Sequence, residues 1–182
     1  MIVYHLDRFK LLQEGQVIEY LRTPIHPEDL NQMVYDKYPK GLSHHGDLYY
    51  AREIEQQFIS DSILENILEY ERLLYYPNRP SRFQSIFTSP SLEQLRQWTE
   101  TSTFKDRDYN ICELEFRHQD FALLDSSWLK FNLNKPSFLT TSYRAKKYWS
   151  GQESDNPKYE LLVQLPVNVI RCIPKSEFVL DH

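Results

Sequence analysis

Hydrophobic residues occur in short runs between polar residues along the first part of the chain. The mainly apolar run over 2–6, which ends in a polar cluster, predicts a short strand. Gly15 marks a turn before a second extended piece at 17–18. Residues 22–50 follow neither a strand repeat nor a helix repeat and contain several prolines, so we predict an irregular segment there.

A helical repeat of hydrophobic residues predicts a helix over 54–74. Ser62 and Glu65 have the spacing of a capping box, which favours a break near 60–62 into two helices. Pro77 follows the last apolar position and is typical of a helix end.

Shorter elements follow this helix. Residues 85–88 predict a strand, and Ser89 with Pro90 is typical of a helix start, with Ser89 as the cap and Pro90 in the first helical position. Alternation over 109–116 predicts another strand, and residues 121–131 favour a strand followed by a short helix.

The last part of the chain contains one predicted helix and two predicted strands. Thr141 or Ser142 caps the helix, and Gly151 ends it. The runs 159–165 and 167–173 are rich in β-formers and predict strands. Helices and strands do not alternate in regular βαβ units, so the predicted class is α+β.

Composition narrows the kinds of nucleotide site that the chain offers. Only 4 of the 182 residues are glycine, whereas average usage gives about 13 in a chain of this length. Neither Gly-rich phosphate motif of the Rossmann or P-loop kind occurs, which argues against both sites. The chain has 13 Tyr, 10 Phe and 3 Trp residues, whose ring faces suit stacking on a base or a nicotinamide. The length suits a single domain over 1–182.

Charge and cysteine content restrict the partners and the compartment. The net charge of −5 argues against a broad basic surface for duplex nucleic acid. Cys112 and Cys172 are flanked by apolar residues and lie in no C-x-x-C motif, which favours two buried thiols. No secretory signal and no run of membrane-spanning length occur, so we expect a cytoplasmic protein that does not enter membranes. Export as an effector without a cleaved signal stays open.

Four segments carry a recognisable pattern in a recognisable order. They are a Tyr-His strand at Tyr4-His5 with a Gly turn over 12–18, an aromatic strand that enters a helix over 81–93, the strand over 109–116, and the pair 148–151 and 159–162. Together they resemble small bacterial ADP-ribosyltransferases of the rifamycin-modifying type. Residues 42–46 and 81–87 also resemble an uncharacterised bacterial domain family that is associated with the same fold.

The resemblance implies a split antiparallel β core with peripheral helices. It also implies transfer of ADP-ribose from NAD to an acceptor with release of nicotinamide, in a bacterial enzyme that acts as a toxin, an effector or a housekeeping transferase. Such chemistry needs NAD held in a strained geometry beside a carboxylate, and it needs no Gly-rich loop. The acceptor is expected to be a protein rather than a nucleic acid, although a small molecule stays open.

The same resemblance implies roles for charged residues. Glu160 opens a late strand, where many members of the fold carry the catalytic glutamate. Glu113 and Glu115 share one face of a strand and are the second choice for this role. His5 binds the adenosine ribose in this interpretation, and Arg8 is its rival for the adenosine side.

Five further residues complete the predicted NAD site. Arg82 precedes the central strand and clamps the pyrophosphate, and Phe87 and Tyr4 stack against the nicotinamide ring. Ser89 lies at a predicted helix start and contacts phosphate there. Tyr148 is a further aromatic candidate, with the protein core as its alternative place.

Two other interpretations stay open. His44, His45 and Asp47 lie close together, but no third metal ligand has a recognisable spacing, so we expect no metal. The same residues allow a His/Asp hydrolase, although no G-x-S-x-G motif is present. A non-catalytic binding module with a tyrosine-rich interface is the stronger of these two alternatives.

Overall fold

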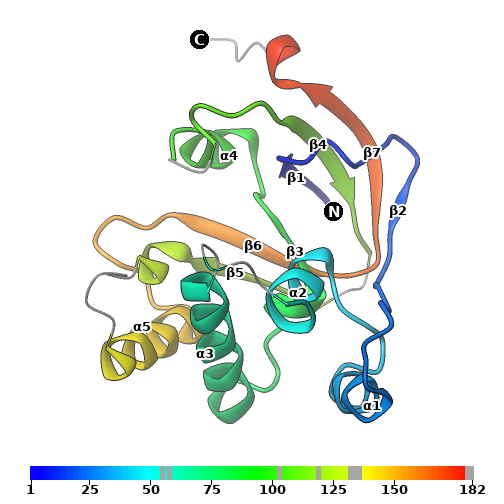
Figure 1. Ribbon diagram of the computed structural model, residues 1–182. Coiled ribbons are helices and arrows are strands. Elements are labelled where there is room, and N and C mark those ends of the chain that lie inside the picture. The colour runs from blue at the N-terminus through cyan, green and yellow to red at the C-terminus, as the bar shows by residue number, and fades with distance from the viewer. Residues whose placement is uncertain (54–55, 57–58, 102–103, 118–119, 131–136, 179–182) are drawn as a thin grey trace.

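The computed structural model describes residues 1–53, 56, 59–101, 104–117, 120–130 and 137–178 (Figure 1). Its strands form two antiparallel sheets, which confirms the α+β class. In the first sheet the order is β1 (Ile2–Asp7), β4 (Asn110–Glu115), β7 (Val167–Pro174) and β2 (Val17–Ile18). In the second sheet the order is β3 (Ser85–Thr88), β6 (Tyr159–Gln164) and β5 (Phe121–Asp125).

Helices lie between and around these strands. They are α1 (Glu28–Lys37), α2 (His44–Gly46) with a π-helical turn (Asp47–Ala51), α3 (Ile59–Tyr75), α4 (Leu92–Thr99) and α5 (Phe138–Ser150). The prediction of an irregular segment over 22–50 is therefore wrong. Its mixed polar sequence becomes helical because Val34, Tyr38 and Leu42 pack on the buried ring of Phe83.

Three predicted helix starts differ from the structure. The helix over residues 59–75 is continuous, because Ser62 donates to the Tyr49 carbonyl at 3.0 Å and does not act as a cap. The proposed extension of this helix back to residue 54 falls partly on positions outside the described residues. Ser91, not Ser89, caps α4, and Ser137 caps α5. The predicted stop at Gly151 is confirmed, because Gly151 has a φ of 79°.

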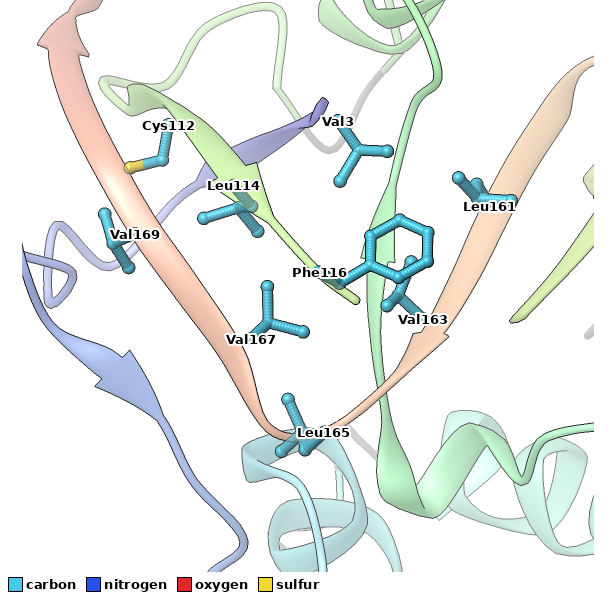
Figure 2. Close-up of a cluster of buried hydrophobic side chains, with 9 residues drawn as sticks. All are labelled: Val3, Cys112, Leu114, Phe116, Leu161, Val163, Leu165, Val167 and Val169. Atoms are coloured by element: carbon cyan, nitrogen blue, oxygen red, sulfur yellow. The ribbon is translucent and has the colours of Figure 1, made fainter. Parts of the chain in front are cut away.

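A hydrophobic core fills the space between the two sheets (Figure 2). Val3 from β1 and Leu114 from β4 meet Leu161 and Val163 from β6 there. The chain passes directly from β6 to β7 through Leu165, so consecutive strands belong to different sheets. This core joins the sheets into one body.

The two cysteines lie in this region and are bonded to each other. Cys112 of β4 stands directly opposite Cys172 of β7, with 4.1 Å between the Cα atoms. The interpretation of the two cysteines as buried thiols is therefore wrong. Neighbouring antiparallel strands brought side chains that are 60 positions apart in sequence within bonding range.

The opposite face of the second sheet is covered by α3 and α5 (Figure 1). Leu162 of β6 packs there against Leu68 of α3 and Trp149 of α5. The Trp149 indole donates to the Leu68 carbonyl at 2.8 Å. None of the helices within the described ranges is long and apolar enough to span a membrane.

One buried ion pair holds the C-terminal half of α3. Arg72 donates to both oxygens of Glu69 at 2.9 and 2.8 Å, and Glu69 also accepts from Tyr38 and Ser81 at 3.0 Å each. Arg72 makes further bonds to the carbonyls of Pro77 and Arg79, at 3.2 and 2.9 Å. We call Arg72, Glu69, Tyr38 and Ser81 the Arg72 cluster.

Edges of the two sheets meet where β1 approaches the end of β3. Tyr4 and Ser89 exchange backbone hydrogen bonds of 2.9 and 2.7 Å. The His5 side chain reaches across the same junction, with Nδ1 2.7 Å from the Phe87 carbonyl oxygen. This junction joins β1, an edge strand of the first sheet, to the end of β3, an edge strand of the second.

Candidate functional site

Arg82 forms the centre of a second buried polar cluster. It lies in the 3₁₀ turn that leads into β3. Its Nε and Nη2 donate to the two carboxylate oxygens of Glu65 at 2.7 and 2.8 Å, a bidentate pair. Its Nη1 donates to the Tyr148 hydroxyl at 2.8 Å and to the Glu160 carboxylate. We call Arg82, Glu65, Glu160 and Tyr148 the Arg82 cluster.

Distant parts of the sequence supply these four residues. Glu65 belongs to α3, Tyr148 to α5 and Glu160 to β6. Glu160 is only 5% exposed, and its Oε1 also accepts from the Tyr148 hydroxyl at 2.6 Å. Side chains alternate along β6, so Glu160 shares the face of Leu162, which turns toward α5.

The cluster holds charges in the protein interior. Burial alone would raise the pKa of Glu65, but Arg82 and His45 outweigh it and hold this pKa well below the usual range of a carboxyl group. Burial would lower the pKa of Arg82, but Glu160 and Glu65 raise it instead. Burial raises the pKa of Tyr148, and Glu160 adds to this against the opposing effect of Arg82. The Tyr148 hydroxyl therefore stays protonated and available as a donor.

Two aromatic rings connect the cluster to its surroundings. The Arg82 guanidinium carbon lies 4.6 Å from the centre of the Phe87 ring. His45 packs edge-on against Phe87 with 4.7 Å between ring centres, and its Nε2 lies 3.2 Å from a Glu65 oxygen. The His45 side chain is 19% exposed, against 9% for Glu65, so His45 connects the cluster to the surface.

Two further histidines, His5 and His44, lie close enough to Arg8 to feel its charge. Burial lowers the pKa of His5 and of His44, and the charge of Arg8 acts in the same direction on both. His5 is therefore neutral near pH 7. Its Nδ1 donates to the Phe87 carbonyl, because a carbonyl only accepts, which leaves Nε2 as an acceptor.

Most of the predicted NAD-site residues lie along one chain of contacts. His5 binds the backbone of Phe87, Phe87 stacks on Arg82, and Arg82 binds Tyr148 and Glu160. His5 nevertheless shares the face of β1 that Val3 turns toward the core between the sheets. His5 and Glu160 are thus linked by contacts through Phe87 and Arg82, but they face different layers. His5 lies on the side of the core between the sheets, and Glu160 lies on the side of α5.

Three residues predicted to bind NAD already make contacts within the protein. The N–H groups of Arg82 are donated to protein side chains, so Arg82 has to exchange partners before it binds a phosphate. Phe87 already stacks on Arg82, which leaves less of the ring for a nicotinamide. The ring of Tyr4 packs with Leu95 and Tyr109, in the cluster beside α4.

Other candidates lie apart from the Arg82 cluster. Glu113 pairs with Arg171 at 2.6 Å, and Glu115 pairs with Arg117 at 3.2 Å. Ser89 is buried and lies two residues before Ser91, which caps α4, so Ser89 is not itself at the helix start that its predicted phosphate contact assumed.

The histidine-rich segment does not form a recognisable metal site. In the part of the chain that the structure describes, no group of three or more His, Cys, Asp or Glu side chains is placed to hold an ion. Asp47 is buried and paired with Arg52, while His44 packs against the ring of Phe9. The arrangement needed for the His/Asp hydrolase is therefore not present among these contacts.

Sequence reasoning missed Glu65 and the contact that His45 makes with it. Glu65 was assigned to a capping box, and His45 was considered with His44 and Asp47 for a metal site or a hydrolase. A usable signal was present, because Glu65, Glu69 and Arg72 are spaced by three or four residues on α3. Ionised residues on the buried side of an amphipathic helix indicate buried pairs.

Comparison with known proteins identifies the family of the chain. A search among curated proteins finds no match. Residues 3–175 match a family described as "Protein of unknown function (DUF2441)". The match covers nearly the whole chain, and the chain therefore belongs to the DUF2441 family.

Proposed function

We propose that the protein is an ADP-ribosyltransferase that uses NAD as its substrate and releases nicotinamide. The observation that carries the proposal is the convergence of Arg82, Tyr148 and Glu160 beside the junction of β1 and β3. At that junction His5 contacts Phe87. Two antiparallel sheets with helices around them are compatible with the split antiparallel core that the resemblance implies, and the proposed reaction needs no Gly-rich loop.

In the proposed reaction, the bond between the ribose C1′ and the nicotinamide nitrogen breaks. The bonding electrons leave with nicotinamide, which loses its positive charge. A nucleophilic atom of the acceptor bonds to C1′ and gives up its proton. A carboxylate stabilises the positive charge that develops on the ribose, and Glu160 is the carboxylate that we assign to this role.

The other residues then orient the reacting groups. Tyr148 fixes the Glu160 carboxylate by a hydrogen bond of 2.6 Å. Arg82 neutralises Glu160 in the free protein. Glu160 is buried and paired with Arg82 in the free protein. For Glu160 to reach the ribose, Arg82 has to leave it and bind either the phosphates of NAD or Glu65 alone.

Titration with NAD at millimolar concentration tests the proposal. We expect a rise in melting temperature and release of nicotinamide, measured by chromatography. Glu160→Gln should abolish the release while the circular dichroism spectrum stays folded. Glu69→Gln is the matched control, because it makes the same change in the equally buried Arg72 cluster.

Three outcomes would change the assignment. Absence of both the thermal shift and the release would overturn the transferase proposal. Full release by Glu160→Gln would move the catalytic role to Glu113 or Glu115. Equal loss in Glu160→Gln and Glu69→Gln would indicate a general effect of disturbing the core.

A second candidate function is a binding module on the same fold. It is favoured by the closure of Arg82 on Glu160 and by the separate faces that carry His5 and Glu160. A thermal shift with NAD and no nicotinamide release in any buffer would support this candidate.

A further inference from the structure

An apolar stripe runs along the outer side of α3. Ile59, Ile63, Ile67, Tyr70 and Leu74 recur at intervals of three or four residues and therefore share one side of the helix. Ile63, Tyr70 and Leu74 are each more than half exposed. Scattered single apolar residues are normal on a surface, but a continuous stripe of this kind marks an interaction site.

The neighbouring helix α5 widens the stripe into a face. Phe138 and Leu139, at the start of α5, are 65% and 79% exposed, and Tyr143 is also exposed. The surface is hollowed between the two helices, where Phe138 of α5 meets Ile63, Ile67 and Tyr70 of α3. We call this surface the α3–α5 face (Figure 1 shows the two helices side by side).

Charge on this face has one sign. The three glutamates of α3 are all buried: Glu65 pairs with Arg82, and Glu69 pairs with Arg72. Glu71 accepts from Ser142 and lies 3.9 Å from the Lys146 ammonium, so Arg144 and Lys147 carry the positive charge of α5 that no glutamate of α3 pairs with. The helix α5 supplies basic groups and no acidic ones, namely Arg144, Lys146 and Lys147. Asp61 is exposed, but it lies on the side of α3 that carries Glu65.

The basic side chains border the apolar surface directly. The Lys146 ammonium lies 4.2 Å from the centre of the Tyr75 ring, and the Lys147 ammonium lies 5.4 Å from that of Tyr143. Such pairs keep the apolar stem of lysine on the ring and leave the charge in water. The face is therefore apolar at its centre and positive along the α5 side.

We propose that the α3–α5 face binds an amphipathic helix of a partner protein, with apolar residues toward the hollow and acidic residues toward α5. Leu74 follows Ile59 by 15 positions, so the stripe is about 22 Å long, which matches a partner helix of about four turns. The hollow between two helices suits a rod-shaped occupant, as in other helix-in-groove complexes. This inference does not depend on the proposed transferase activity.

A fluorescent peptide of about 16 residues tests the proposal, with leucine at i, i+4, i+7 and i+11 and glutamate beside them. Its matched control carries lysine in place of glutamate. We expect the full-length protein to bind the acidic peptide at least about tenfold more tightly than the basic one in an anisotropy titration.

Variants locate the binding site on the protein. Tyr70→Asp should weaken binding of the acidic peptide by about tenfold or more. Lys146→Glu combined with Lys147→Glu should remove the preference for the acidic peptide. Met33→Asp changes an exposed apolar residue on α1 in the same way, and it should leave binding unchanged.

Four outcomes would overturn the proposal. The first is no binding of the acidic peptide up to about 1 mM, and the second is equal binding of both peptides. The third is self-association, seen in sedimentation velocity, that Tyr70→Asp abolishes. The fourth is sedimentation of the protein with vesicles of phosphatidylglycerol and phosphatidylcholine that Tyr70→Asp abolishes. The third result would assign the face to a second copy of the chain. The fourth would assign it to an anionic lipid surface.

Discussion

The two buried arginines of the molecule have the same chemistry and different surroundings. Arg72 and Arg82 each hold a glutamate of α3 by a bidentate pair. Arg72 faces one carboxylate, and its remaining bonds go to backbone carbonyls of the turn that follows α3. Arg82 faces two carboxylates, and its remaining bonds go to side chains of α5 and β6.

This difference separates a cluster of balanced charge from the cluster to which we assign the proposed reaction. The Arg72 cluster has balanced charge and fixes how the chain leaves α3. The Arg82 cluster has one carboxylate more than it has guanidinium groups, and it connects to the surface through His45. Burying an excess charge is costly, so it is retained where a ligand or proton compensates it.

The largest expected effect comes from removing either cation. Arg72→Leu should lower the free energy of unfolding by about 3–5 kcal/mol, because it leaves a buried carboxylate unpaired. Arg82→Leu should cost more, because it leaves two. Urea denaturation followed by circular dichroism measures both values. A smaller loss for Arg82→Leu would show that the two clusters do not differ in charge balance as described.

Acid should weaken the Arg82 cluster in a defined pH range. The folded pKa of Glu65 lies below its unfolded value, so the stabilisation is complete above the unfolded pKa and is lost as the pH falls below it. With an unfolded value of about 4.3, roughly 2 kcal/mol should be lost between neutral pH and pH 3.

The comparison of wild type with Glu65→Gln isolates this contribution. The gap between their unfolding free energies should be widest near pH 7 and should narrow at pH 3. A gap that stays constant over this range would contradict the lowered pKa of Glu65.

Matched tyrosine variants compare the two clusters through smaller losses of unfolding free energy. Tyr148→Phe removes the hydroxyl between Arg82 and Glu160, and Tyr38→Phe removes the hydroxyl on Glu69. Each should cost about 1–3 kcal/mol of stability. Only Tyr148→Phe should also change the thermal shift with NAD, and the same change in Tyr38→Phe would contradict a special role for the Arg82 cluster.

The smallest expected effect concerns His45. His45→Gln should lower the free energy of unfolding by about 1 kcal/mol, because it removes the contact of the ring with Glu65 while a polar amide remains beside it. It should still alter the NAD response, since His45 connects the cluster to the surface. A stability loss of several kcal/mol would place His45 with the structural residues instead.

Periodic segments were predictable from sequence, and segments stabilised by distant contacts were not. The strands at 2–6 and 85–88 were predicted because a short run of β-forming residues beside polar residues is a local signal. The helix α1 was missed because its apolar residues are few, and it depends on packing against Phe83 from a remote turn.

The candidate site shows the same division. Glu160 and Tyr148 were identified through motifs, whereas their bonds to Arg82 arise from strand pairing and helix packing. The motifs that contain Glu65 and His45, a capping box and the segment 42–46, do not indicate that Glu65 pairs with Arg82 and His45. Charge partners separated by 17 to 78 positions in sequence cannot be read from local spacing.

The bond between Cys112 and Cys172 divides the chain into a covalent ring and two arms. The ring contains β5, α5 and β6, so Tyr148 and Glu160 lie inside it, while Glu65 and Arg82 lie on the N-terminal arm. Closing a ring of 60 positions lowers the entropy of the unfolded chain by an amount worth about 4 kcal/mol. The Arg82 cluster thus joins two side chains of the N-terminal arm to two side chains of the covalent ring.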